Sequence, residues 1–100
     1  MAESKSNGSR SRAKGISARD AVQTVREDFP ELFGRPVESV LGVERDEGSG
    51  WIVTVQVVEL ERIPSTTDVL GAYAVQLDAD GELVGYRRRR RYHRGQADED

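Results

Sequence analysis

The chain has 100 residues, of which 36% are hydrophobic and 33% charged, with a formal net charge of −3, so it can form at most one small domain with a thin core. It contains no cysteine and a single histidine, which excludes disulfides, thiolate metal sites and histidine-cluster metal sites. The first residues lack the apolar segment of a signal peptide, and no apolar run approaches the roughly 18 residues that span a bilayer, so we expect a cytoplasmic protein with no membrane partner.

The charges are unevenly distributed along the chain. Residues 1–15 are rich in Ser, Gly, Lys and Arg, residues 16–86 are strongly acidic, and six arginines follow within residues 87–94. Segments with almost no apolar residues cannot bury enough surface to offset the entropy of ordering. We therefore expect a disordered basic arm at residues 1–15, one domain at residues 16–95, and a disordered acidic tail at residues 96–100. The arm is interpreted either as a solubilising segment or as a contact for nucleic acid or an acidic partner.

A helix is predicted to begin at Ser17, which is suited to accept a hydrogen bond as the N-cap, with Asp20 in the first turn. Apolar residues then recur at helical spacing and predict one buried stripe. The stripe consists of Ala18, Ala21, Val22, Val25 and Phe29. Because Pro30 disfavours helical geometry in the residue before it, the main helix is expected to end near Asp28, followed by a short turn that stops at Gly34.

Four strands are predicted after the helix. A weak strand spans Pro36 to Glu47, with Gly42 marking either a bulge or a close contact with the helix, and the strongest strand spans Trp51 to Arg62. A third strand spans Val69 to Leu77, and the Asp-Gly turn that ends at Gly81 joins it to a fourth strand spanning Glu82 to His93. In the second strand Trp51, Val53, Val55 and Val57 share one face, which should pack on the helix. The predicted fold class is α+β, with one N-terminal helix packed on a four-stranded antiparallel β-meander.

The fourth strand contains five consecutive arginines, which is unusual for a strand. Simple alternation places Tyr86, Arg88, Arg90 and Tyr92 on one face, and Arg87, Arg89, Arg91 and His93 on the other. Since burial of an uncompensated charge is costly, both faces must reach water or carboxylates. We therefore expect this strand to lie at the sheet edge or to extend past the helix.

Three interpretations of the arginines remain open. The first is an edge strand with ion pairs to acids of the same chain, for example Glu59, Glu61 or Asp68. The second is a docking surface for an acidic protein partner. The third is a nucleic-acid-binding surface, which the acidic body disfavours. The candidate partner-binding residues are Tyr86, Arg87, Arg88, Arg90, Arg91 and Tyr92.

No combination of residues typical of catalysis or cofactor binding is found. The acids are scattered over predicted turns and exposed faces, and no pair is placed for general acid–base chemistry. The segment containing Asp78, Asp80 and Glu82 is far too short for a calcium-binding loop and is predicted to be a hairpin turn. We therefore expect a protein that is not an enzyme and that has no cofactor and no metal.

Several segments together resemble the gas vesicle protein O family. They are VTVQVVELERIP from residue 53, TTDVLGAY from residue 66, LDADGEL from residue 77, GYRR from residue 85 with RRY and RGQ after it, and ISARDAVQTVREDFPELFG from residue 16. One departure is Arg89, where an apolar or neutral residue is expected. The resemblance implies a non-enzymatic, cytoplasmic, gas vesicle-associated accessory protein whose partners are other gas vesicle proteins. A nucleic-acid-binding regulator of gas vesicle gene expression is the alternative it implies.

Overall fold

A computed structural model describes residues 15–95, so the predicted basic arm, apart from Gly15, and the predicted acidic tail lie outside the described residues. The helix α2 spans Ala18–Phe33 and is followed by the strands β1 (Ser39–Arg45) and β2 (Trp51–Leu60). A short 3-10 helix, η2 (Ser65–Thr67), precedes β3 (Val69–Leu77) and β4 (Leu83–His93). The strands form one antiparallel sheet in the order β1-β2-β3-β4, which confirms the predicted meander.

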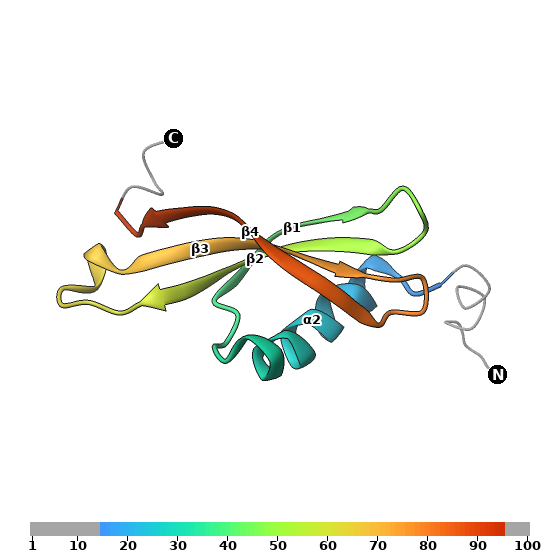
Figure 1. Ribbon diagram of the computed structural model, residues 1–100, viewed down its shortest axis with the longest axis horizontal. Coiled ribbons are helices and arrows are strands. Elements are labelled where there is room, and N and C mark those ends of the chain that lie inside the picture. The colour runs from blue at the N-terminus through green and yellow to red at the C-terminus, as the bar shows by residue number, and fades with distance from the viewer. Residues whose placement is uncertain (1–14, 96–100) are drawn as a thin grey trace.

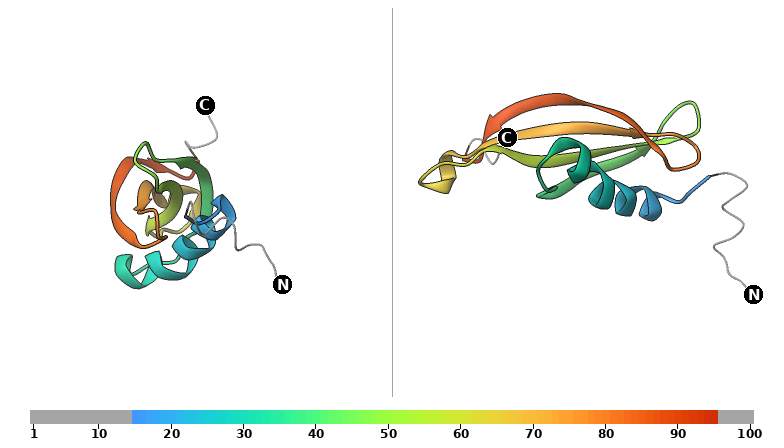
Figure 2. Two further views of the ribbon diagram at one scale, coloured as in Figure 1. Left: turned by 90° about the vertical axis from the view of Figure 1, so that its right-hand side faces the viewer. Right: turned by 60° about the horizontal axis from the view of Figure 1, so that its bottom comes forward.

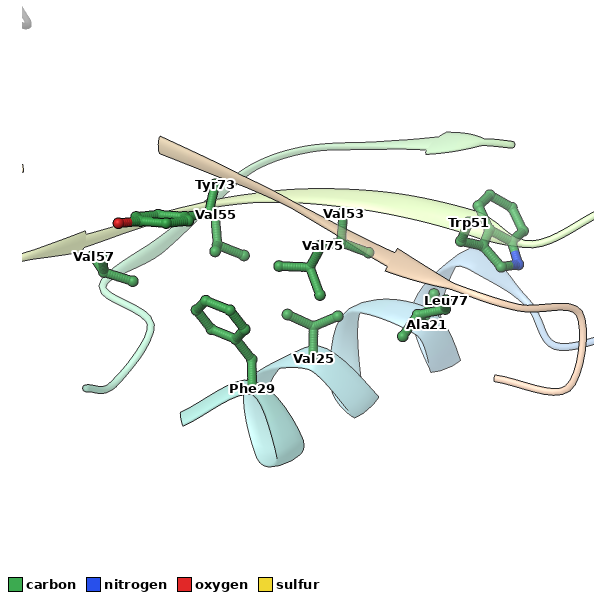
Figure 3. Packing of buried hydrophobic residues seen from close by; sticks show 10 residues of the cluster. All are labelled: Ala21, Val25, Phe29, Trp51, Val53, Val55, Val57, Tyr73, Val75 and Leu77. Atoms are coloured by element: carbon green, nitrogen blue, oxygen red, sulfur yellow. The ribbon is translucent and has the colours of Figure 1, made fainter. Parts of the chain in front are cut away.

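The helix covers one face of the sheet, and the core lies between them (Figure 1). As predicted, alternate residues of β2 from Trp51 to Val57 point toward α2 and are buried. Figure 3 shows them packed against Ala21, Val25 and Phe29 of the helix, together with alternate residues of β3. The core is therefore a single layer of side chains, as expected for a chain with this apolar content.

The predicted N-cap at Ser17 and the predicted stop at Gly34 are confirmed, but the predicted end of the main helix near Asp28 is wrong. Ser17 caps the N-terminus by accepting a hydrogen bond from the backbone N–H of Asp20 at 3.1 Å, and Gly34 ends the helix with a φ of 94°. The helix continues through Pro30, which lies in the last turn and removes only one backbone donor. Continuation places the ring of Phe33 against that of Phe29, with ring centroids 5.0 Å apart, so aromatic packing offsets the lost hydrogen bond.

Bulges interrupt the strands and curl the sheet. The register shifts beside Gly42, as predicted, which makes Leu41 an extra residue of β1. Similar shifts make Glu59 an extra residue of β2 and Arg89 an extra residue of β4. An unpaired residue bends its strand and increases the local twist. The end-on view in Figure 2 shows the resulting curled sheet, with α2 on one side of it.

Candidate functional site

Among residues 15–95, β4 pairs with β3 alone and is therefore an edge strand, as expected from its arginines. It is 11 residues long, and part of it extends beyond the region that α2 covers (Figure 1). All five side chains from Arg87 to Arg91 are exposed. Charged residues on an edge strand oppose pairing with other chains, so this edge is protected against unspecific strand addition.

The predicted division of β4 into two faces is wrong, because the bulge at Arg89 reverses the alternation of side chains. The alternation holds from Gly85 to Arg88, after a first shift that leaves Val84 as an extra residue, and residues after Arg89 are shifted by one further position relative to β3. The face toward the helix receives Tyr86, Arg88 and Arg91. The opposite face receives Arg87, Arg90 and Tyr92. Sequence alternation alone could not reveal this shift, because a bulge is defined by the register against the neighbouring strand, here β3.

On the helix side, Arg88 and Arg91 both bind Glu59. The Arg88 Nε donates to the Glu59 carboxylate at 3.1 Å, and the Arg91 Nε lies 3.3 Å from its other oxygen. The hydroxyl of Tyr73 also donates to this carboxylate at 2.6 Å, and only 9% of the Glu59 side chain is exposed. Burial, followed by the hydrogen bond to Glu59, raises the pKa of the Tyr73 phenol. The predicted ion pair to Glu59 is therefore confirmed, and two of the five arginines are held by it.

Tyr86 takes part in the packing of the core as well as lying at the surface. Its ring packs edge-on against Phe29 at a centroid distance of 5.1 Å and against Phe33 at 5.7 Å. Nevertheless 42% of the residue remains exposed. Tyr86 is thus the outer member of an aromatic cluster that joins the end of α2 to β4.

A second ionic cluster surrounds Arg94, which was not among the residues predicted to bind a partner. Its guanidinium lies 3.0 Å from Asp68 and 2.8 Å from Glu38, which precedes β1. The backbone N–H of Arg62 and then Arg94 lower the pKa of Asp68. Arg94 therefore links the end of β4 to the other edge of the curled sheet. Asp68, which was predicted to pair with the arginine run, pairs instead with Arg94, the arginine that follows it.

The face opposite α2 carries the remaining arginines of the run. The guanidinium of Arg90 lies over the ring of Tyr92, 4.7 Å from its centroid, while the Tyr92 hydroxyl donates to Gln56. Within residues 15–95, Arg87 and Arg89 are paired with no carboxylate. This face therefore retains positive charge that the folded domain itself does not neutralise.

The exposed arginines give this surface the chemistry of the guanidinium group. Exposed guanidinium groups bind carboxylates or phosphates, often through two parallel hydrogen bonds. Among residues 15–95, no group of three or more His, Asp or Glu side chains is arranged to hold a metal ion. The same part of the chain contains no helix with the length and apolarity that a membrane crossing requires.

Fold and surface together define a small α+β domain with a curled sheet and an arginine-bearing edge. The family described as gas vesicle synthesis protein GvpO matches residues 3–98. The chain belongs to this family, as the resemblance noted in the sequence implied.

Three relatives illustrate the match. Gas vesicle protein O of a Streptomyces species is 54% identical over 68 residues, which cover 68% of this chain and 52% of the relative. Gas vesicle protein O of Haloferax mediterranei is 37% identical over 98% of this chain and 69% of the relative, and gas vesicle protein O1 of Halobacterium salinarum is 33% identical over 88% and 73%. The match thus spans about half the length of the Streptomyces relative. No solved structure shows a significant match to the chain.

Proposed function

We propose that this protein is a non-catalytic accessory protein of gas vesicle assembly, located in the cytoplasm and associated with the vesicle, that binds other gas vesicle proteins through β4. The description of its family as gas vesicle synthesis protein supports a role in gas vesicle formation. One observation carries the binding role: Arg87 and Arg89 project from an edge strand and, within residues 15–95, neutralise no carboxylate. Because these guanidinium groups are not engaged by carboxylates of the described domain, they can form charge-assisted hydrogen bonds to carboxylates of a partner protein.

An acidic protein segment suits this surface better than a nucleic acid does. The chain has a net charge of −3, and its acids lie on the same domain as the arginines. Two acids lie on the same sheet surface as these arginines, at the β1 end of it. Glu44 lies near the end of β1, and Asp46, which follows β1, accepts a 2.9 Å hydrogen bond from Gln76. A phosphate backbone carries one charge per nucleotide and would meet these carboxylates, whereas a peptide can place its acids on one side only.

The test is capture of other gas vesicle proteins by the full chain carrying Arg87→Glu and Arg89→Glu. These two residues are preferable to Arg88 and Arg91, because reversing the latter would disrupt the Glu59 cluster and confuse binding with folding. The matched control is Arg19→Glu with Arg26→Glu, which makes the same charge change on the exposed side of α2.

Loss of capture by the β4 variant but not by the α2 variant supports the proposal. Equal capture by both variants would exclude β4 as the binding surface. A band shift of nucleic acid at low salt that depends on Arg87 and Arg89, with capture of vesicle proteins unchanged, would instead support the regulator.

A further inference from the structure

The two edges of the sheet differ in how they are protected against pairing with a further strand. Five arginines protect β4, whereas β1 has two charged residues, Glu44 and Arg45, both at its end. Among residues 15–95, β1 pairs with β2 alone, and Figure 1 shows it along the upper margin of the sheet at its hairpin end. Leu41 and Val43 of β1 are 50% and 38% exposed. This edge is therefore apolar and lacks the barrier of charge that β4 has.

The backbone of β1 directs hydrogen-bonding groups away from the sheet. The N–H of Asp46 donates to the carbonyl of Gly50 at 2.9 Å, where the chain leaves β1. Bonded and non-bonded pairs alternate along an antiparallel ladder, so Glu44 also bonds to β2. The residues on either side of Glu44, which are Val43 and Arg45, then point their N–H and C=O groups outward. Another strand can accept and donate hydrogen bonds at both positions.

A second copy of β1 fits this edge when a two-fold axis passes beside Val43. The two Val43 residues then form a bonded pair, with N–H and C=O groups exchanged between the copies. Glu44 lies opposite Gly42 of the copy, and Arg45 lies opposite Leu41 of the copy. Each charged residue of β1 is therefore directly opposite an uncharged one, and the two exposed valines meet across the axis.

Other pairings of this edge are less favourable. An axis at Glu44 or Arg45 places that residue opposite its own copy, and like charges directly opposite each other destabilise a sheet. An axis at Gly42 makes the first bonded pair depend on Leu41, which the bulge removes from the regular ladder. An acidic segment, such as we propose for β4, would bring further carboxylates beside Glu44 and the exposed Glu47. The charges along β1 therefore favour a second copy as the occupant.

We propose that two copies of this chain associate by antiparallel pairing of their β1 edges about Val43. The pairing joins the two four-stranded sheets into one continuous sheet, with β4 of each copy at an outer edge. Because the paired segment is short, the dimer should be weak, with a Kd on the order of 100 μM. The inference is independent of the proposed function, since both β4 strands remain accessible in the dimer.

The test combines sedimentation equilibrium with amide hydrogen exchange of the full chain, at concentrations from about 10 μM to about 1 mM. We expect a monomer–dimer equilibrium in sedimentation. The amides of Val43 and Arg45 should exchange more slowly as the concentration rises, because the second copy then accepts their hydrogen bonds. The amide of Glu44 faces β2 in monomer and dimer alike, so its exchange should stay constant and serves as the internal reference.

Charge substitutions at the axis test the register. Val43→Lys places two like charges opposite each other and should raise the Kd at least about tenfold. The matched control is Val84→Lys, which makes the same change at an exposed valine of β4 and should leave the Kd unchanged. An equimolar mixture of the Val43→Lys and Val43→Glu chains places opposite charges across the axis, so dimers should form again. Recovery in the mixture also shows that both variant chains are folded.

Several results would overturn the inference. They are a chain that remains monomeric at about 1 mM, a dimer that Val43→Lys does not weaken, and a mixture of the two variants that fails to recover. A dimer in which the Val43 and Arg45 amides exchange as they do in the monomer would place the contact elsewhere on the surface. Protection of these amides only after addition of another gas vesicle protein would assign the β1 edge to a strand of that protein instead of a second copy.

Discussion

The substitution Gly71→Ala is expected to destabilise the protein by displacing the Glu59 carboxylate. A Cβ at residue 71 would overlap the Glu59 carboxylate oxygen and lie 2.8 Å from Cε1 of Tyr73, closer than ordinary van der Waals contact. Moving the carboxylate removes the hydrogen bond donated by the Tyr73 hydroxyl, which for a charged acceptor is worth about 1.5–3 kcal/mol. Replacing Gly by Ala in a strand returns about 0.5–1 kcal/mol. The net loss in the free energy of unfolding is therefore about 1–2 kcal/mol.

A double-mutant cycle separates this mechanism from a general effect of the added methyl group. In a Glu59→Ala background the carboxylate is absent and no longer holds the Tyr73 hydroxyl, so the ring can move away from the new methyl group and Gly71→Ala should be neutral or stabilising. The coupling free energy should then be about 1.5–3 kcal/mol, the value of the hydrogen bond that is lost only in the presence of Glu59. Urea unfolding followed by fluorescence suits the measurement, because the single tryptophan, Trp51, is buried and donates to the Ile16 carbonyl at 3.0 Å. Additivity within about 0.5 kcal/mol would refute the argument that Gly71 is required by Glu59.

Three further substitutions test other parts of the structure. Pro30→Ala should raise the free energy of unfolding by about 1 kcal/mol, because the helix gains a backbone donor; a helix that ended near residue 28 would show no gain in urea unfolding. Because the backbone N–H of Arg62 and then the guanidinium of Arg94 lower the pKa of Asp68 below its ordinary value of 3.8, the stabilisation by this carboxylate is present above pH 3.8 and is lost as pH falls below it. Asp68→Asn should thus flatten the acid limb of stability against pH, and an unchanged limb would contradict this. Phe29→Ala should cost about 3–5 kcal/mol, measured by thermal unfolding, because the fully buried ring joins α2 to the sheet; a loss below about 1 kcal/mol would contradict this packing.

Element order and the core face were accessible from the sequence because both depend on local patterns. Alternation from Trp51 to Val57 identified the buried face of β2, and the Asp-Gly dipeptide located the β3–β4 turn, where Gly81 has a φ of 89°. Side-chain direction in a strand and the conformational freedom of glycine are properties of the residues themselves. These features can therefore be predicted without knowing which strands pair with each other.

The candidate site was only partly accessible. An exposed arginine edge strand and its ion pairs could be predicted from charge alone, since buried guanidinium groups need carboxylates. The sequence could not predict which arginines would be paired, because Glu59 is 29 residues distant from Arg88 in the chain. The same holds for Arg94 and Glu38, which are separated by 56 residues.

The sequence by itself determined one helix followed by a four-stranded meander, with an arginine-rich edge, because periodicity and charge act over a few residues. Only the tertiary structure decided which face each arginine occupies. The bulge at Arg89 shifts the alternation by one position, so Arg88 and Arg91 meet Glu59 on one face while Arg87 and Arg90 lie on the other. That choice is set by register against β3, a long-range contact that no local pattern encodes.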